Sequence, residues 1–246
     1  MRRVEKSRAI RLERGQVPVT VYFEARRAAR ASIGSRGVHI RIPAWLSAAE
    51  REAQIRHLRG WAEKTLKKNP DRFLPPPARG YCQGEALTIG GRIFRLNIRH
   101  GGVKRGSARI AGEILQVRLP ADLPPADEAV LLPRLIARAA GREYLPQLRE
   151  TLGNLNDEHF RAALGKVAFR DNRVLWGSCS IRGNISIATR LLLAPREVLE
   201  YVCIHELAHL VERGHSRRFW DLVSRAMPAW KEARRWLRAN QQSCRF

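Results

Sequence analysis

Residues 195–215, PREVLEYVCIHELAHLVERGH, contain the pattern that decides the fold of the second half of the chain. Pro195 stands where a proline is tolerated in the first turn of a helix, and Gly214 is a residue type at which helices commonly end. Apolar residues recur on one flank between them, which predicts an amphipathic helix over 195–214. Three histidines lie among its last residues and directly after it.

The first two of these histidines have the spacing of metal ligands. His205 and His209 are four positions apart, so a helix places them one turn apart on the same face. Two imidazoles at that spacing can share one tetrahedral ion at about 2 Å each. Glu206, one residue further round the helix, can reach a water at the ion without binding the ion itself. This HExxH pattern predicts two metal ligands and a general base.

A catalytic zinc ion takes three protein ligands and keeps a fourth position open for water. His215 is the candidate for the third ligand, because Gly214 permits the turn that brings it back toward the ion. The step from His209 to His215 matches that of the metzincins, but Glu212 stands where their glycine lies, so the turn is expected to differ. We expect the Glu212 side chain to be solvated. The alternative is a helix that carries exposed histidines by chance.

The bulk composition excludes several classes of protein. The 246 residues are 44% hydrophobic and 28% charged, as in ordinary globular proteins. No apolar run is long enough to cross a bilayer, and the basic N-terminus lacks the apolar core of a signal peptide. We therefore expect a cytoplasmic protein without a membrane partner. The four cysteines form no CxxC pair, which excludes a zinc ribbon.

The first half of the chain is predicted to be rich in strands, with one helix. Ser47, followed three residues later by Glu50, gives that helix a capping box at its start. Glycine pairs and single glycines between β-branched runs indicate hairpins. The predicted elements are strands at 17–24 and 37–42, a helix over 47–69, a linker or turn at 70–80, and hairpins turning at Gly90-Gly91 and Gly112.

After residue 122 the pattern changes from strands to helices. Helical periodicity covers 129–156, where two prolines are expected to bend or divide the helix. Short strands at 166–171 and 184–188 flank a loop, and one or two helices close the chain. No internal repeat stands out. The prediction is an α+β protein with two domains, a basic β-rich module with one helix at 1–122 and a helical domain with a short β-sheet at 123–246.

The positive charge is unusual in size and distribution. The net charge is +23, and residues 1–118 hold 26 Lys and Arg against 9 Asp and Glu, whereas residues 119–246 hold 20 against 14. Such an excess suits a polyanion, so DNA or RNA bound by the arginine-rich front half is a possible partner. The alternative is a genome rich in G and C that favours arginine codons, with the side chains simply solvated.

The wider stretch 176–230, which contains WGSCS, NISI, LAPREVLEYV, HELAHL and GHSRRFW, resembles the YgjP-like zinc metallopeptidase family. It is more loosely similar to the SprT and WLM metalloproteases. The resemblance implies a zincin-like α+β fold, a zinc ion held by His205, His209 and His215, and a catalytic role for Glu206. The front half is also similar in layout to the family, through its strand pair, its helix after AWLS and its IGGRIFRL stretch.

This chain departs from the family pattern at one position. Leu175 precedes Trp176, where the family commonly has an arginine. A role of that arginine in holding the substrate or the wall of the site is therefore in question. Arg173 is the residue that could take its place.

The predicted function is zinc-dependent hydrolysis of a peptide bond in a protein or peptide substrate, with Glu206 as the general base. The strand at 184–188 could offer an unpaired edge on which an extended substrate lies. Trp176, Ser178 and Trp220 are candidates for the wall of the substrate site, although aromatic residues at such positions also pack cores. The alternative function is that of a nucleic-acid-associated protein, including a protease that acts on DNA-bound proteins.

Overall fold

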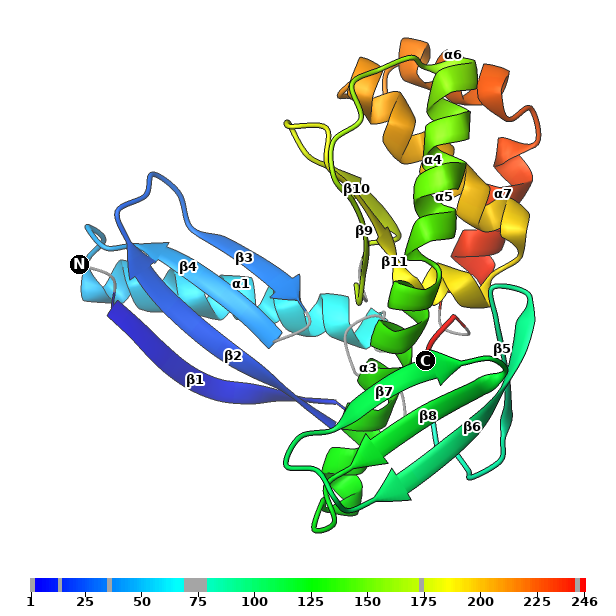
Figure 1. Cartoon of the computed structure of the whole chain (residues 1–246). Coiled ribbons are helices and arrows are strands. Elements are labelled where there is room, and N and C mark those ends of the chain that lie inside the picture. The colour runs from blue at the N-terminus through cyan, green and yellow to red at the C-terminus, as the bar shows by residue number, and fades with distance from the viewer. Residues whose placement is uncertain (1–2, 13–14, 35–36, 69–78, 173–174, 242–243) are drawn as a thin grey trace. The chain divides into compact units, whose positions relative to one another are not determined.

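The computed structural model describes residues 3–12, 15–34, 37–68, 79–172, 175–241 and 244–246. It confirms the mixed α+β class (Figure 1). The chain forms two compact units, Met1–Pro77 and Ala78–Phe246. The boundary expected near residue 122 falls inside the second unit, and most of the predicted linker at 70–80 lies outside the described residues.

The first unit is one sheet covered on one face by one helix. Alternate residues of its central strands are buried with residues of the helix in a single cluster that includes Val19, Ile40 and Leu66. The strand order is β1-β2-β4-β3, with β2 and β4 parallel and both outer pairs antiparallel. The elements are β1 (Arg3–Leu12), β2 (Gly15–Glu24), β3 (Arg30–Gly34), β4 (Gly37–Pro43) and α1 (Ala48–Lys68).

The helix α1 starts at the predicted capping box. The backbone N–H of Ser47 donates to Oε2 of Glu50 at 2.8 Å, and the Ser47 hydroxyl donates to the same oxygen at 2.7 Å. The backbone N–H of Glu50 donates in return to the Ser47 hydroxyl at 3.4 Å. These bonds satisfy amide groups that have no partner within the helix, so the start of α1 is fixed by local chemistry.

The second unit begins with another four-stranded sheet, to which the two predicted hairpins contribute. Alternate residues, among them Phe94, Leu96 and Leu115, are buried against the following helix α3, which lies behind the sheet in Figure 1. The elements are β5 (Ala86–Ile89), β6 (Arg92–His100), β7 (Ser107–Ala111), β8 (Ile114–Leu119) and α3 (Pro125–Glu143).

The two units share one topology, which the sequence did not indicate. The second sheet has the order β5-β6-β8-β7, with β6 and β8 parallel and both outer pairs antiparallel. Each unit therefore contains four strands in the same order, followed by a helix on one face of the sheet. The chain contains a structural repeat without a visible sequence repeat, because the topology requires only alternating apolar residues and well-placed turns.

The rest of the second unit holds the histidine helix. A three-stranded sheet of order β10-β11-β9 packs with helices around a cluster that includes Leu152, Ile187 and Leu207. No helix in the described ranges is long and apolar enough to cross a membrane. The elements are α4 (Leu145–His159), β9 (Val167–Arg170), β10 (Gly177–Cys179), β11 (Ile185–Ala188), the 3-10 helix η1 (Thr189–Leu193), α5 (Arg196–Val211), α6 (Arg217–Ala226) and α7 (Trp230–Ala239).

Several details of this region differ from the prediction. The WGSCS segment contains the strand β10 where a loop was expected, and β10 makes the predicted strand β11 central instead of an edge. The prediction of an unpaired edge at 184–188 is therefore wrong, because β11 pairs with β10 on one side and with β9 on the other. Of the two prolines, Pro133 lies inside α3, and the break between α3 and α4 falls at Tyr144.

Candidate metal centre

Helix α5 positions the first two histidines from within the core. Buried residues occur around most of its surface, including Val198, Cys203 and Leu207. A helix that is apolar on most sides must be enclosed by the rest of the fold, and α5 packs against α4, α6, α7, β10 and β11. The expected amphipathic helix is thus a buried one. Since neighbours hold it on several sides, its side chains are well fixed.

The three predicted ligands come together. His205, His209 and His215 each offer one ring nitrogen, and these nitrogens all lie within 4.8 Å of one another. The Nε2 atoms of His205 and His215 are 3.1 Å apart. Two nitrogens bound at about 2.05 Å to one tetrahedral ion lie roughly 3.3 Å apart, so the observed separation suits a shared ion.

A backbone carbonyl fixes the orientation of the second histidine. The Nδ1 atom of His209 lies 3.1 Å from the carbonyl oxygen of Glu212. Because a carbonyl can only accept, Nδ1 carries the proton and Nε2 keeps the lone pair that a metal ion needs. Glu212 thus acts through its backbone, which the sequence alone did not indicate.

The turn to the third ligand does not use the conformational freedom of Gly214 that the prediction invoked. The helix α5 ends at Val211, and its C-cap residue Glu212 is extended, with φ −132° and ψ 111°. Gly214 is not among the glycines of positive φ. The helix therefore stops three residues earlier than expected, and the extended residue Glu212 redirects the chain toward His215.

Burial keeps two of these imidazoles neutral. It lowers the pKa of His205 to about 3, with smaller contributions from His209 and His215, and it also lowers the pKa of His209. A neutral imidazole is the form that binds a metal ion. The Nδ1 atom of His205 is buried and has no hydrogen-bond partner within the described ranges.

Aromatic rings back and flank the histidines. Phe219 is fully buried, and its ring centroid lies 4.9, 4.6 and 4.8 Å from those of His205, His209 and His215. Trp220 stacks on His215 with centroids 5.8 Å apart. Ser216 accepts a hydrogen bond from the backbone of Phe219 at 3.3 Å and so starts α6 directly after the third ligand.

The carboxylate of Glu206 lies against the edge strand. The residue is 5% exposed, and burial raises the pKa of Glu206 to about 7. Among the described residues it forms no ion pair. A Cβ atom added to Gly177 of β10 would stand 2.5 Å from Oε1 and 2.7 Å from Cγ of Glu206. Only a glycine allows the strand to come so close to this carboxylate.

Of the three predicted wall residues, one contacts the histidines and two do not. Trp220 contacts the histidines, as described above. Ser178 is exposed, and by strand alternation it points to the face opposite that of its neighbour Gly177 and hence away from Glu206. Trp176 is half buried, and no ring contact joins it to the histidines in the described part of the chain.

An arginine that the sequence analysis missed lies on Trp176. The guanidinium of Arg190 stands 3.5 Å from the centroid of the Trp176 ring and is almost fully buried. Burial lowers the pKa of Arg190 to about 10. Leu175, which replaces the arginine of the family pattern, is half exposed, and Arg173 lies outside the described residues. The one available signal was a single charged residue in the otherwise uncharged run TRLLL.

These features define a class of protein. Three convergent imidazoles form a site that fits a divalent metal ion, and imidazole ligands suit several first-row metals, so the donors leave the metal unspecified. All four cysteines are free, and none belongs to the cluster. A histidine triad beside a buried carboxylate suggests a metal-binding hydrolase.

Comparison with known proteins identifies the family. The chain belongs to the YgjP-like metallopeptidase domain family, whose model matches residues 27–240. It is 33% identical over 61 residues to the UTP pyrophosphatase of Escherichia coli strain K12, a match that covers 25% of this chain and 36% of that protein. In structure it is similar to the metallopeptidase zymogen abylysin of Pyrococcus abyssi, with 28% identity, a TM-score of 0.35, and coverage of 38% of this chain and 95% of that one.

Proposed function

We propose that this chain is a zinc-dependent peptidase in which His205, His209 and His215 hold the ion and Glu206 is the general base. The observation that supports this most strongly is the position of the Glu206 carboxylate, which is buried one residue from a ligand and turned toward the edge strand β10. A zinc ion in this site supplies a Lewis acid for the substrate carbonyl and lowers the pKa of water to about 7.

The remaining steps fall to residues of the chain. Glu206 accepts a proton from the attacking water and passes it to the leaving amine. The strand β10 pairs only with β11 within the described sheet, so its outer edge offers free N–H and C=O groups to an extended peptide. A peptide held there as an added strand runs past Glu206, because Gly177 brings β10 against that side chain.

A second candidate reaction is hydrolysis of a phosphoric anhydride in a nucleoside triphosphate. The observation in its favour is the positive charge near the site: the Arg234 guanidinium lies 4.9 Å from the centroid of Trp220, the ring that stacks on His215, and Arg213 stands two residues before His215. Cationic side chains next to a metal ion suit a triphosphate better than a neutral peptide bond. The partial likeness to a UTP pyrophosphatase points the same way.

One assay with two substrate classes distinguishes these reactions. The zinc-loaded chain is incubated with a mixture of unstructured peptides and, separately, with UTP and the other nucleoside triphosphates. We expect new peptide termini by mass spectrometry and no release of pyrophosphate. Pyrophosphate release without peptide cleavage would replace the proposal with the second candidate, and activity on neither substrate would remove both.

The position of Glu206 is tested by Gly177→Ala. The new methyl group overlaps Oε1 and Cγ of Glu206, so the carboxylate must move. Because a displacement of about 1 Å in a catalytic group can cost 100-fold in rate, we expect kcat to fall by about 10- to 100-fold while the bound metal per chain is unchanged. Initial rates and elemental analysis of the same sample measure both quantities.

Gly153→Ala is the matched control for this substitution. Gly153 lies inside α4 with no atom within 4 Å of an added Cβ, so the methyl group meets open space. We expect parental activity and slightly higher stability, since alanine is the better helix former. Parental activity in Gly177→Ala as well would show that Glu206 does not depend on this close approach.

A further inference from the structure

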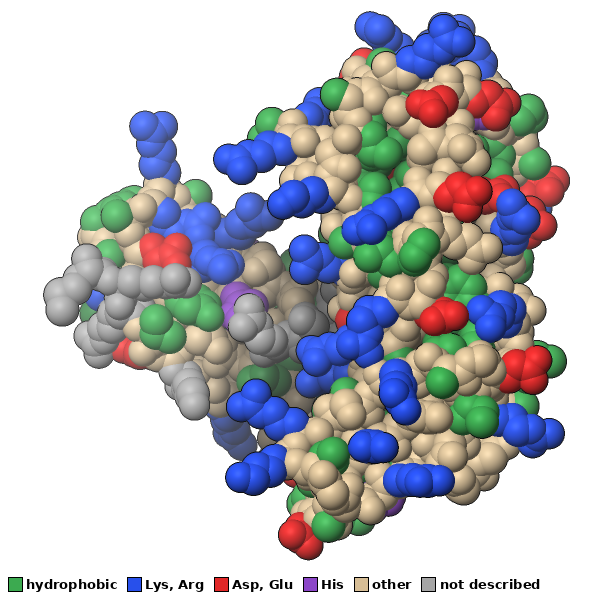
Figure 2. Space-filling view, viewed as in Figure 1, with side chains coloured by type: hydrophobic (Ala, Val, Ile, Leu, Met, Phe, Trp, Pro, Cys, Tyr) green, Lys and Arg blue, Asp and Glu red, His purple; other side chains and the backbone are tan. Residues whose placement is uncertain are grey.

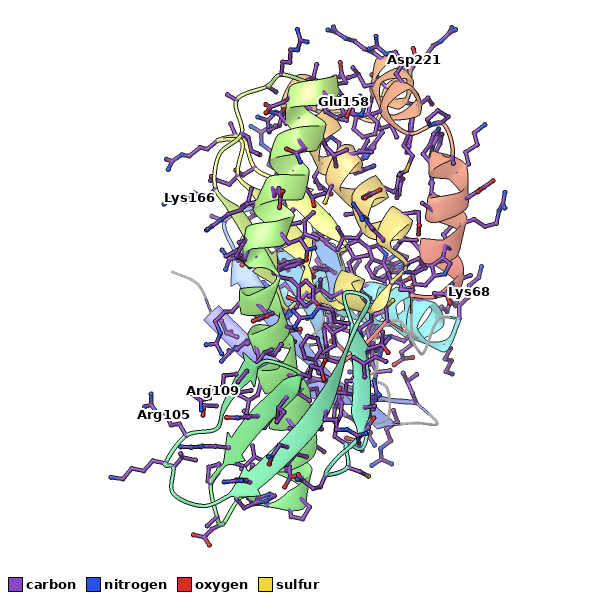
Figure 3. All side chains as sticks on the ribbon, turned by 45° about the vertical axis from the view of Figure 1, so that its right-hand side comes forward. Lys68, Arg105, Arg109, Glu158, Lys166 and Asp221 are labelled. Carbon is purple, nitrogen blue, oxygen red and sulfur yellow. The ribbon has the colours of Figure 1, made fainter. Side chains whose placement is uncertain are left out.

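The face of the β5–β8 sheet that points away from α3 carries a concentrated positive charge. The outward positions alternate with the buried ones, and they include Arg95, Arg99, Arg109 and Arg118. All four side chains are exposed, and no acidic residue occupies an outward position on these strands. Basic side chains stand over this sheet in Figure 2, and Figure 3 shows Arg105 and Arg109 projecting to the same side of the unit.

No acidic side chain of the described residues compensates the positive charge of these four arginines. None of them forms an ion pair with a residue of the described ranges. By contrast, Arg92 pairs with Glu143 and Arg196 pairs with Glu200. The positive charges of the four arginines are therefore available to an anionic ligand.

The register brings two of the charges together. Arg99 of β6 and Arg118 of β8 are direct partners across the parallel pair. Neighbouring strands are about 4.8 Å apart, so two like charges stand opposite each other near the C-terminal ends of the two central strands, an arrangement that destabilises the pair. An anion that bridges both guanidinium groups would remove that repulsion.

The polar residues between the arginines fit the same kind of ligand. Asn97 and Gln116 are register partners at the centre of the face, and Arg109 donates from Nε to Oε1 of Gln116 at 3.0 Å. Guanidinium and amide groups are the side chains that contact phosphate and sugar oxygens, and an exposed sheet is a surface on which several proteins bind single strands.

We infer that this face, defined by Arg95, Arg99, Arg109 and Arg118, binds a single strand of nucleic acid through its phosphodiester backbone. Nucleic acid is favoured over a small anion because the charges extend over three strands of the sheet instead of converging on one point. The inference does not depend on the proposed hydrolase function. The four arginines lie on β6, β7 and β8, whereas the histidines lie on α5 and directly after it.

The test measures binding of the full chain to a labelled single-stranded oligonucleotide over a range of salt concentrations. Four phosphate contacts predict a slope of log K against log salt of about −2.8, and the double variant Arg99→Gln/Arg118→Gln should reduce it to about −1.4. At roughly 100 mM salt that difference corresponds to about 25-fold weaker binding. Circular dichroism and metal content, which these exposed substitutions should leave unchanged, verify that the variant is folded.

The control is Arg134→Gln/Arg138→Gln, which removes the same charge from exposed positions of α3, on the other side of the sheet. We expect binding within twofold of the parent. Equal losses in both double variants would overturn the inference in favour of unspecific charge attraction. It is also overturned if binding is indifferent to salt, if a duplex of the same sequence binds more tightly than the single strand, or if only anionic lipid vesicles bind.

Discussion

Replacing Glu206 with glutamine is expected to leave the metal in place and to lower kcat by a factor of about 10² to 10⁴, the usual contribution of a general base. Glutamine has the shape of glutamate but cannot accept a proton at neutral pH. The residue lies one position from His205 and is not a member of the histidine cluster, so its loss as a base leaves the three ligands intact. Initial rates on whichever substrate the parent cleaves, with elemental analysis of the same protein, separate the two effects.

Glu212→Gln is the matched control for this experiment. Its backbone carbonyl, and not its side chain, is the partner of His209. The amide substitution therefore keeps the hydrogen bond that orients the ligand, and we expect parental rates. If Glu206→Gln turns over substrate as fast as the parent, Glu206 is not the base, and another group takes the proton.

The same variant carries information for both candidate substrates. A peptide bond needs a proton for its leaving amine, whereas pyrophosphate is a good leaving group without one. A loss near the upper end of the range therefore suits amide hydrolysis, and a smaller loss suits phosphoanhydride hydrolysis. Together with the two-substrate assay, this comparison connects the role of one carboxylate to the class of bond that is cleaved.

The histidine centre was predictable because its information is local. His205 and His209 are one helical turn apart, and that relation follows from helix geometry alone. The same holds for the capping box of Ser47 and Glu50, whose partners are three residues apart. Where a contact is set by a short sequence separation, the residue types and the spacing together specify it.

Features that depend on contacts between residues far apart in the sequence were not predictable, because no local pattern specifies those contacts. The strand β10 has three residues and no apolar alternation, so only its pairing with β11 makes it a strand. Because of that pairing, β10 forms the edge of the sheet and β11 does not, which is why the predicted substrate edge at 184–188 was wrong. The stacking of Arg190 on Trp176 likewise joins residues that neither periodicity nor spacing relates.

The topology that the two units share shows most clearly what the sequence pattern could not predict. In β1, charged and polar residues separate the few apolar ones, and its pattern RVEKSRAIRL gives little sign of a strand. The corresponding β5 has the alternating pattern ALTI and a glycine turn. Both occupy the same place in their sheets, because position in a sheet depends on pairing with the next strand and only weakly on composition.

Removing the third ligand is expected to weaken metal binding by more than about 100-fold, since even the loss of a group that only orients a ligand costs 10- to 100-fold. His215 is exposed and lies beyond the end of α5, so His215→Ala should leave the core intact. Its Nε2 atom is one of the convergent nitrogens, at 3.1 Å from that of His205. Isothermal titration with zinc measures the change in affinity directly.

Thermal unfolding supplies an independent measurement of the same site. Metal at 1,000 times the parent's Kd stabilises the folded state by about 4 kcal/mol, which raises Tm by roughly 8–16 °C for a unit of this size. With affinity reduced 100-fold, the same metal concentration gives His215→Ala only about 1.4 kcal/mol, and hence a shift of a few degrees. His100→Ala is the control, because His100 is exposed and pairs with Glu128 at 3.0 Å, outside the cluster. If His215→Ala keeps the full metal-dependent shift while His100→Ala behaves as the parent, the ion is held by other groups and His215 is not its third ligand.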